Sequence, residues 1–169
     1  MNKVLTRWNA LDPITAASEI LPCCGSQAWA EALTASRPIG DELTLFESST
    51  KIWRALPEAA WQQAFDSHPR IGQQHAQRAT EKSLRWSAQE QSKAATTDAT
   101  KQAIEEANLR YEQKFHRIFI VCATGKTSAE ILDILEFRIN NDPATELREA
   151  AEQQRQITEL RLHRWLESQ

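Results

Sequence analysis

Three side chains in the sequence could carry acid–base or anion chemistry, and the first is His68, within FDSHPRIG (65–72). Proline disfavours a helical conformation for the residue before it, so His68 is expected at or just past a helix C-terminus. It follows Ala64 and Phe65 by four and three residues, on an apolar helical face. The negative end of the helix dipole would favour an imidazolium there, as acid–base chemistry needs. A half-buried histidine that hydrogen-bonds the last carbonyls of its helix fits the same pattern, which by itself favours that structural role.

The second candidate is Glu90, within SAQEQ (87–91). Ser87 and Glu90 have the spacing of a capping box, which predicts a helix that begins here and explains both residues. A carboxylate in the first turn of that helix could also reach a histidine. Neither role excludes the other.

The third candidate is Arg161, in the last predicted helix. It falls near an apolar stripe made by Leu147, Ala150, Gln154 and Ile157. An arginine with its stem on apolar surface and its head in solvent is the interpretation that the pattern favours. The alternative is a guanidinium presented to a small anionic ligand, since its planar fork suits a carboxylate.

Metal and nucleotide sites find little support in the sequence. His68, His75, His116 and His163 form no H-E-x-x-H or Glu-x-x-His pairing. The stretch ATGKTS (123–128) imitates the end of a phosphate loop, but Ile120 stands where that motif needs glycine. We therefore predict neither a metal ion nor a nucleotide.

The composition is that of an ordinary globular domain. The 169 residues are 41% hydrophobic and 25% charged, with a net charge of −3, which argues against a nucleic-acid binder. No run is long enough for a membrane span, and neither a signal-peptide core nor a peroxisomal tail is present, so we expect a cytoplasmic protein without a membrane partner. Cys23, Cys24 and Cys122 form no disulfide or zinc pattern, and we expect reduced thiols with packing roles.

Apolar residues recur at three- and four-residue steps, which predicts helices. One helical face runs through Ile104, Ala107, Tyr111, Phe115, Ile118, Phe119 and Cys122, with Gly125 as its C-cap. The capping box Thr127 to Glu130 begins the next helix, which stops at NNDP, and a last helix covers about 144–166.

The N-terminal half predicts shorter helices. One begins at Asp12-Pro13 and ends at Pro22, and others cover 26–36, 41–56 and 57–67. The polar stretch 73–85 has no clean period and is expected to be a loop or a weak helix, placed to cover a site. With no repeat and no linker, the prediction is an all-α fold, a single-domain multi-helix bundle over 1–169.

An ordered series of motifs gives these residues a context. SHPRIG, SAQEQ, ANLRYEQKF, FIVCATGKTSAEIL, RINNDPATEL and ITELRLHRW occur in this order after CCGSQAWAEALTASRP. The series resembles the 2-oxo-4-hydroxy-4-carboxy-5-ureidoimidazoline (OHCU) decarboxylases of uric-acid degradation, over nearly the whole chain. The resemblance implies an all-helical, dimeric, cofactor-free enzyme that acts on a small molecule and converts OHCU to (S)-allantoin with loss of carbon dioxide.

The resemblance also assigns roles to residues. The family's catalytic histidine, glutamate and arginine match His68, Glu90 and Arg161. Its substrate contacts match Pro69, Ser87, Ala88, Gln89, Gln91, Phe119, Ile120, Val121, Cys122 and Ala123. The chain departs from the family at His116 and Arg117, because the family usually has glycine after the phenylalanine of KF. The alternatives are a non-enzymatic helical binding or assembly module, and an OHCU-like ligand binder that has lost activity.

Overall fold

Every described element of the chain is helical. The structure is a computed structural model that describes residues 2–73, 80–91 and 97–168, and this part holds nine helices and no strand. None of the described helices is both long and apolar enough to cross a bilayer. The chain divides into two compact units, Met1–Ala64 with Arg155–Gln169, and Phe65–Gln154. The all-α prediction is confirmed, whereas the assignment of 1–169 to a single domain stays a prediction.

The first unit holds α1 (Lys3–Asn9), α2 (Pro13–Cys24), α3 (Gln27–Ala35), α4 (Glu42–Ala55), most of α5 (Glu58–Asp66) and the end of α9 (Pro143–Glu167). Asp12 caps α2 as predicted, with its carboxylate accepting from the Ile14 and Thr15 amides. Pro22 does not end this helix: α2 continues to Cys24 and ends at Gly25, which has φ 86°. A proline so near the C-terminus removes only one intrahelical donor, so the helix tolerates it.

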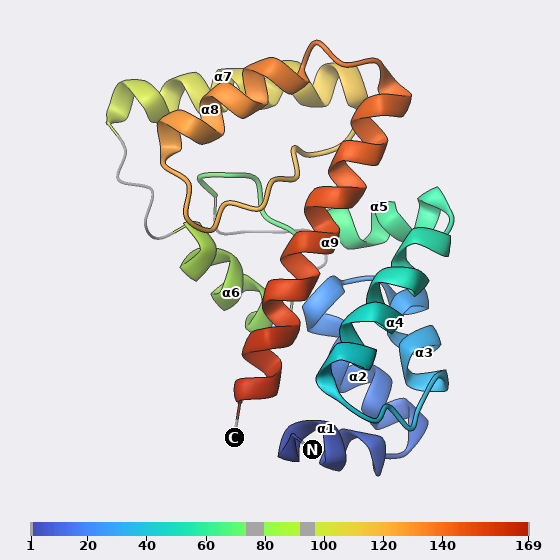
Figure 1. The fold of residues 1–169 in the computed structure, drawn as a ribbon. Helices are drawn as coiled ribbons and strands as arrows, with labels where there is room; N and C mark the ends of the chain where they lie inside the picture. The colour runs from blue at the N-terminus through green and yellow to red at the C-terminus, as the bar shows by residue number, and fades with distance from the viewer. Residues whose placement is uncertain (1, 74–79, 92–96, 169) are drawn as a thin grey trace. The chain divides into compact units, whose positions relative to one another are not determined.

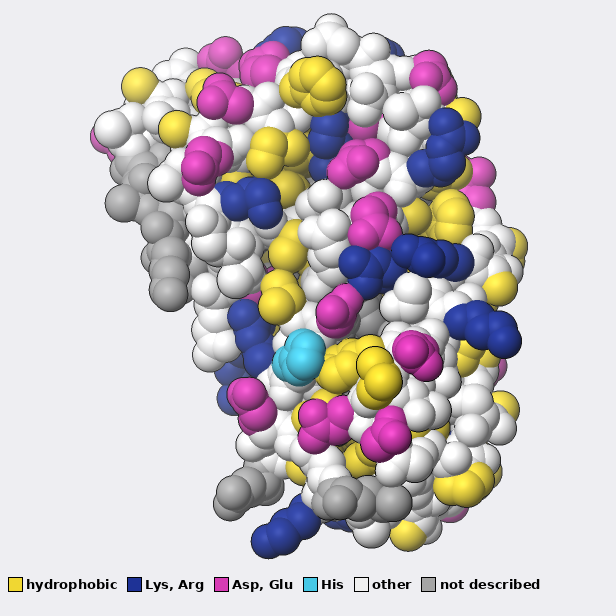
Figure 2. All heavy atoms as spheres, in the orientation of Figure 1, with side chains coloured by type: hydrophobic (Ala, Val, Ile, Leu, Met, Phe, Trp, Pro, Cys, Tyr) yellow, Lys and Arg dark blue, Asp and Glu magenta, His cyan; other side chains and the backbone are white. Residues whose placement is uncertain are grey.

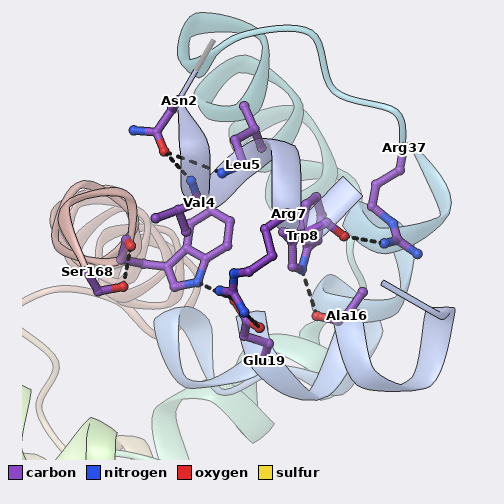
Figure 3. A network of polar contacts seen from close by, with 10 residues as sticks. Asn2, Val4, Leu5, Arg7, Trp8, Ala16, Glu19, Arg37 and Ser168 are labelled. Carbon is purple, nitrogen blue, oxygen red and sulfur yellow. Dashed lines mark hydrogen bonds and ion pairs between the residues drawn. The ribbon is translucent and has the colours of Figure 1, made fainter. Parts of the chain in front are cut away.

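The largest fully buried side chains of this unit are tryptophans, and Figure 3 shows Trp8 among its polar contacts. Trp8 packs edge-to-face on Trp165, with ring centroids 5.7 Å apart. The indole N–H of Trp8 donates to the Ala16 carbonyl, and that of Trp165 donates to Glu19. Because each buried N–H has an acceptor, these large rings can be buried without a desolvation penalty.

The second unit holds α6 (Glu81–Gln91), α7 (Asp98–Phe115), α8 (Ser128–Arg138) and the first part of α9, and α7 and α8 pack side by side (Figure 1). The capping box of Thr127 and Glu130 begins α8 as predicted. The apolar core of this unit lies between these helices and residues 119–123, and consists of Ala107, Tyr111, Phe115, Phe119, Val121, Ala123, Ile131 and Leu135.

The predicted helix through Cys122 is wrong beyond Phe115. His116 adopts φ 55° and ψ 30° as the left-handed C-cap of α7, and its amide donates to the Glu112 carbonyl. A glycine at this position would carry no steric cost, because a left-handed residue without Cβ is unstrained. Residues 118–123 then continue without helix, and Gly125 lies in the turn before α8 rather than at a helix end.

Candidate active site

His68 lies two residues past α5, as its position before Pro69 predicts. Its backbone amide donates to the Phe65 carbonyl at 3.0 Å, and the residue is 9% exposed. The His68 backbone amide therefore bonds one of the last carbonyls of the helix, whereas the structural role considered in the sequence analysis required the imidazole to make such a bond. The ring has another contact.

That contact is Gln154, a residue of α9 that is 0% exposed. His68 Nε2 lies 2.7 Å from Gln154 Oε1. With the amide oxygen as acceptor, Nε2 carries the proton and Nδ1 becomes the basic nitrogen of the neutral ring. The sequence placed Gln154 on the stripe of Arg161 but did not identify it as a site residue. Sequence spacing cannot show a contact across 86 residues.

Glu90 lies in the last turn of α6, not the first. The predicted capping box at Ser87 is wrong because α6 begins six residues earlier, at Glu81. Thr80 is the actual cap: its hydroxyl accepts from the Ser83 amide, and the Ser83 hydroxyl accepts from the Thr80 amide, each at 3.1 Å. Residues 81–85 are therefore helical, whereas the loop prediction for 74–79, including His75, lies outside the described residues. Half-buried Glu90 is left without a capping function.

The turn that carries His68 meets the end of α6. The Gly72 amide donates to Gln91 Oε1 at 3.1 Å, which joins the two motifs that the sequence predicted to meet. Of the other predicted contact residues nearby, Pro69 and Ser87 are buried, whereas Ala88 and Gln89 are exposed. The exposed pair on α6 points to solvent, so Pro69, Glu90 and Gln91 are the better placed members of this set.

Residues 119–123 form the other predicted binding segment, and all five are buried. The Cys122 amide donates to Gln153 Oε1 at 2.8 Å. Gln153 is the neighbour of Gln154, so two consecutive α9 residues contact the segment and the His68 ring. The second unit thus brings together His68, the end of α6 and the 119–123 segment through α9 and the Gly72–Gln91 bond.

Arg161 belongs to the first unit and is 0% exposed, so the interpretation with its head in solvent is wrong. Its Nη1 donates to the Pro22 carbonyl at 3.4 Å. Pro22 lies in the last turn of α2, where carbonyls lack helical donors and a cation is favoured. Burial alone costs a guanidinium much free energy, so Arg161 must be held by acceptors.

A cavity of about 140 Å³ lies in the second unit. It is lined by Ile71, Gly72, Gln91, Lys101, Ile104, Glu105, Ser128 and Ile131. Neither His68 nor Glu90 lines it, so it is not assigned as the reaction site. Among the described residues no group of three or more metal-ligating side chains occurs.

Comparison with known proteins gives these residues a context. The model of one family, described as OHCU decarboxylase, matches residues 9–163. A uric acid degradation bifunctional protein, TTL, from Arabidopsis thaliana is 38% identical over 142 residues, which is 83% of this chain and 44% of that protein. The chain thus spans less than half of that relative. An OHCU decarboxylase from Amia calva is 28% identical over 134 residues, 79% of this chain and 77% of that protein.

Two solved structures have folds similar to that of this chain. A crystal structure of OHCU decarboxylase in the presence of (S)-allantoin has a TM-score of 0.77 and 35% identity, covering 89% of this chain and 98% of that one. A crystal structure of (S)-allantoin synthase has a TM-score of 0.72 with 19% identity, covering 95% of this chain and 53% of that one. The second likeness concerns the fold alone.

Proposed function

The chain belongs to the OHCU decarboxylase family, and from that premise we propose that it decarboxylates OHCU to (S)-allantoin. The family match, the two curated relatives and the similar structure with (S)-allantoin support this carboxy-lyase activity in urate degradation. The observation that carries the proposal for the site is the buried His68 ring beside Gln154, joined through Gly72 and Gln91 to the helix end that bears Glu90. In a helical binding module the same imidazole would serve packing alone, and the activity of His68→Ala distinguishes the two functions.

The substrate supplies its own electron sink. Its carboxylate is on a carbon that also carries a hydroxyl and adjoins a ring C=N. When the bond to the carboxylate breaks and carbon dioxide leaves, its electron pair forms a C=C bond while the C=N pair moves to nitrogen, which takes up a proton. The hydroxyl then loses its proton to become the carbonyl, and the ureido-bearing carbon takes up a proton on one face. No metal or organic cofactor is needed for this sequence, so we propose cofactor independence.

The residue roles in this proposal follow the chemistry. His68 hydrogen-bonds the substrate hydroxyl and moves a proton, and Glu90 stabilises the imidazolium. Arg161 anchors substrate oxygens with its planar fork. Pro69, Gln91 and the 119–123 segment hold the remaining surface of the substrate, which orients the bond that breaks.

The test of this proposal is a direct assay. Freshly generated OHCU is added to the purified protein, and (S)-allantoin is followed by circular dichroism, with and without a chelator. We expect turnover that survives the chelator, and a loss of about 10²–10⁴-fold in folded His68→Ala. Loss of activity with the chelator and recovery with a divalent metal would contradict cofactor independence, and normal turnover in His68→Ala would return that residue to a structural role.

We also propose a homodimer, which the family resemblance implies. Two large hydrophobic side chains on neighbouring helices support it, because Phe137 on α8 is 74% exposed and Leu109 on α7 is 60% exposed. An ion pair between Arg110 and Glu136, the residues beside them, joins the two helices. Analytical ultracentrifugation should give a dimer that Phe137→Glu weakens; a monomeric wild type would refute the proposal.

A cytoplasmic location and the absence of a nucleic-acid partner complete the proposal. All three cysteines are buried free thiols, which agrees with a reducing compartment, and burial raises the pKa of Cys24 to about 12, which makes that thiol unreactive. Acidic and basic side chains are interleaved on the face drawn in Figure 2, so this face offers no continuous basic patch to which a polyanion could bind. Cell fractionation and a nucleic-acid retention assay test the two points.

A further inference from the structure

The 119–123 segment is buried, non-helical backbone whose polar groups need partners from outside a helix. Side chains supply three of them. Arg138 Nη1 donates to the Ile120 carbonyl at 2.7 Å, and Lys126 Nζ donates to the Cys122 carbonyl at 2.8 Å. Gln153 Oε1 accepts from the Cys122 amide at 2.8 Å. The backbone on both sides of Val121 is therefore oriented by side chains from α8 and α9.

Arg138 is itself held rigidly by a buried ion pair. Arg138 is 3% exposed and Glu146 0% exposed, and Nη2 lies 2.5 Å from Glu146 Oε1. The Tyr111 hydroxyl and the Asn141 amide also donate to this carboxylate, and the guanidinium lies 4.6 Å from the Phe119 ring centroid. Burial and the bond to Glu146 raise the pKa of the Tyr111 phenol, so it remains a donor.

The placement of these charges limits their cost. Arg138 lies in the last turn of α8 and Glu146 in the first turn of α9, where each helix dipole favours the charge present. Even so, a buried ion pair is often no more stabilising than apolar residues of the same volume. An arginine does have one property that an apolar residue lacks: its fork can bond the carboxylate through Nε and Nη2 and still direct Nη1 at a carbonyl.

Peptide planarity transmits these contacts to Val121. In a trans peptide the carbonyl and the following amide point in opposite directions. Because the Ile120 carbonyl points at Arg138, the Val121 amide points away from Arg138; because the Cys122 amide points at Gln153, the Val121 carbonyl points away from Gln153. Within the described residues, neither Val121 group has a hydrogen-bond partner, although Val121 is buried. Buried backbone groups of this kind call for a partner.

We propose that Arg138, Glu146 and Gln153 are positioning residues of the decarboxylase, which orient the Val121 amide and carbonyl to bind an amide or ureido group of the substrate. The inference rests on the proposed function, because that function assigns the 119–123 segment to substrate binding. Gln153 has its own fixed orientation, since its Nε2 donates to Glu149 Oε1 at 3.0 Å and leaves Oε1 for Cys122.

The test compares Arg138→Met and Gln153→Met with Arg110→Met, which breaks an ion pair between exposed side chains. We expect KM to rise by about 10-fold in Arg138→Met and in Gln153→Met, because each of these two variants loses a hydrogen bond that orients one Val121 group. KM should stay unchanged in Arg110→Met. Amide hydrogen exchange, measured by NMR, should be faster at Val121 and Cys122 only in the first two. The double variant Gln153→Glu with Glu149→Gln keeps an acceptor for the Cys122 amide and reverses the hydrogen bond between the two side chains, so it should retain the wild-type KM.

The outcomes separate this inference from the proposed function. If Arg138→Met does not fold, Gln153→Met decides. Wild-type KM and exchange in the folded variants would overturn the inference. If the wild type does not decarboxylate OHCU, the proposed function fails, and titration with (S)-allantoin then decides: a shift of the Val121 amide that Gln153→Met abolishes supports the oriented backbone, and no shift overturns it.

Discussion

Gln154 offers a sharp test of how the site works, because its amide contacts the His68 imidazole directly. Gln154→Leu removes the acceptor that lies 2.7 Å from Nε2, at a position that is fully buried. A buried imidazole N–H left without that acceptor costs about 1–3 kcal/mol. The ring escapes this cost by rotating or by changing tautomer, and either response moves the basic nitrogen away from the substrate.

The expected loss follows from that range. A cost of about 1.4–2.8 kcal/mol corresponds to about a 10–100-fold fall in kcat, since each 1.36 kcal/mol is a factor of ten in rate. KM should change little, because Gln154 acts through His68. The assay is allantoin formation by circular dichroism, with thermal unfolding measured on the same samples.

Two further variants make the result specific. Gln154→Glu places a carboxylate beside the imidazole and stabilises its protonated form. The midpoint of the kcat–pH profile that reports ionisation of His68 should therefore move to higher pH by about one to three units. Gln102→Leu is the matched control, because Gln102 is an exposed glutamine that bonds Glu106 on α7. A folded Gln154→Leu protein with wild-type kcat would refute the assignment of His68 orientation to Gln154.

The remaining predictions concern single side chains. Glu90→Gln should lose about 10²–10⁴-fold in rate with an unchanged melting temperature, since Glu90 caps no helix; a clearly lower melting temperature would contradict this. Arg161→Met should abolish turnover while folding normally, and Arg161→Lys should raise KM because the planar fork is lost; normal turnover in either variant would make Arg161 structural. His116→Gly should stabilise the protein by about 0.5–1 kcal/mol, because glycine relieves the left-handed strain at an exposed position. Differential scanning calorimetry checks it, and a lower melting temperature would show that the His116 side chain makes compensating contacts.

The sequence predicted most helices because their signals are local. Asp12 and Thr127 are side-chain caps within three residues of the amides they bind, and a sequence pattern can identify such contacts. The end of α7 was missed for a related reason. Phe115, Ile118 and Phe119 have helical spacing, and the left-handed residue at 116 is a histidine rather than the expected glycine. A buried non-helical segment of this kind has no polar alternation to distinguish it from helix.

The candidate site was predictable only where motifs are contiguous. His68 with Pro69, and Glu90 with Gln91, are recognisable as short motifs, and the Gly72–Gln91 bond joins them. Gln154 gave no such signal, because its role depends on a tertiary contact across the chain. The same holds for Glu146, which resembles an ordinary first-turn carboxylate until its burial is known. Local patterns thus identified the proposed catalytic residues more readily than the buried side chains that contact them.

The uneven distribution of tryptophan gives the two units different optical signatures. Trp8, Trp29, Trp53, Trp61 and Trp165 all belong to the first unit, and Trp86 on α6 is the only one in the second. Intrinsic fluorescence therefore reports mainly on the first unit, and the difference between the spectra of the wild type and a Trp86→Phe variant gives the emission of Trp86. That emission would then report on the helix that carries Glu90, four residues further on, and on Lys82, whose ammonium lies 4.8 Å from the indole centroid. Substrate binding at the end of α6 could be followed through this single emitter, without any extrinsic dye.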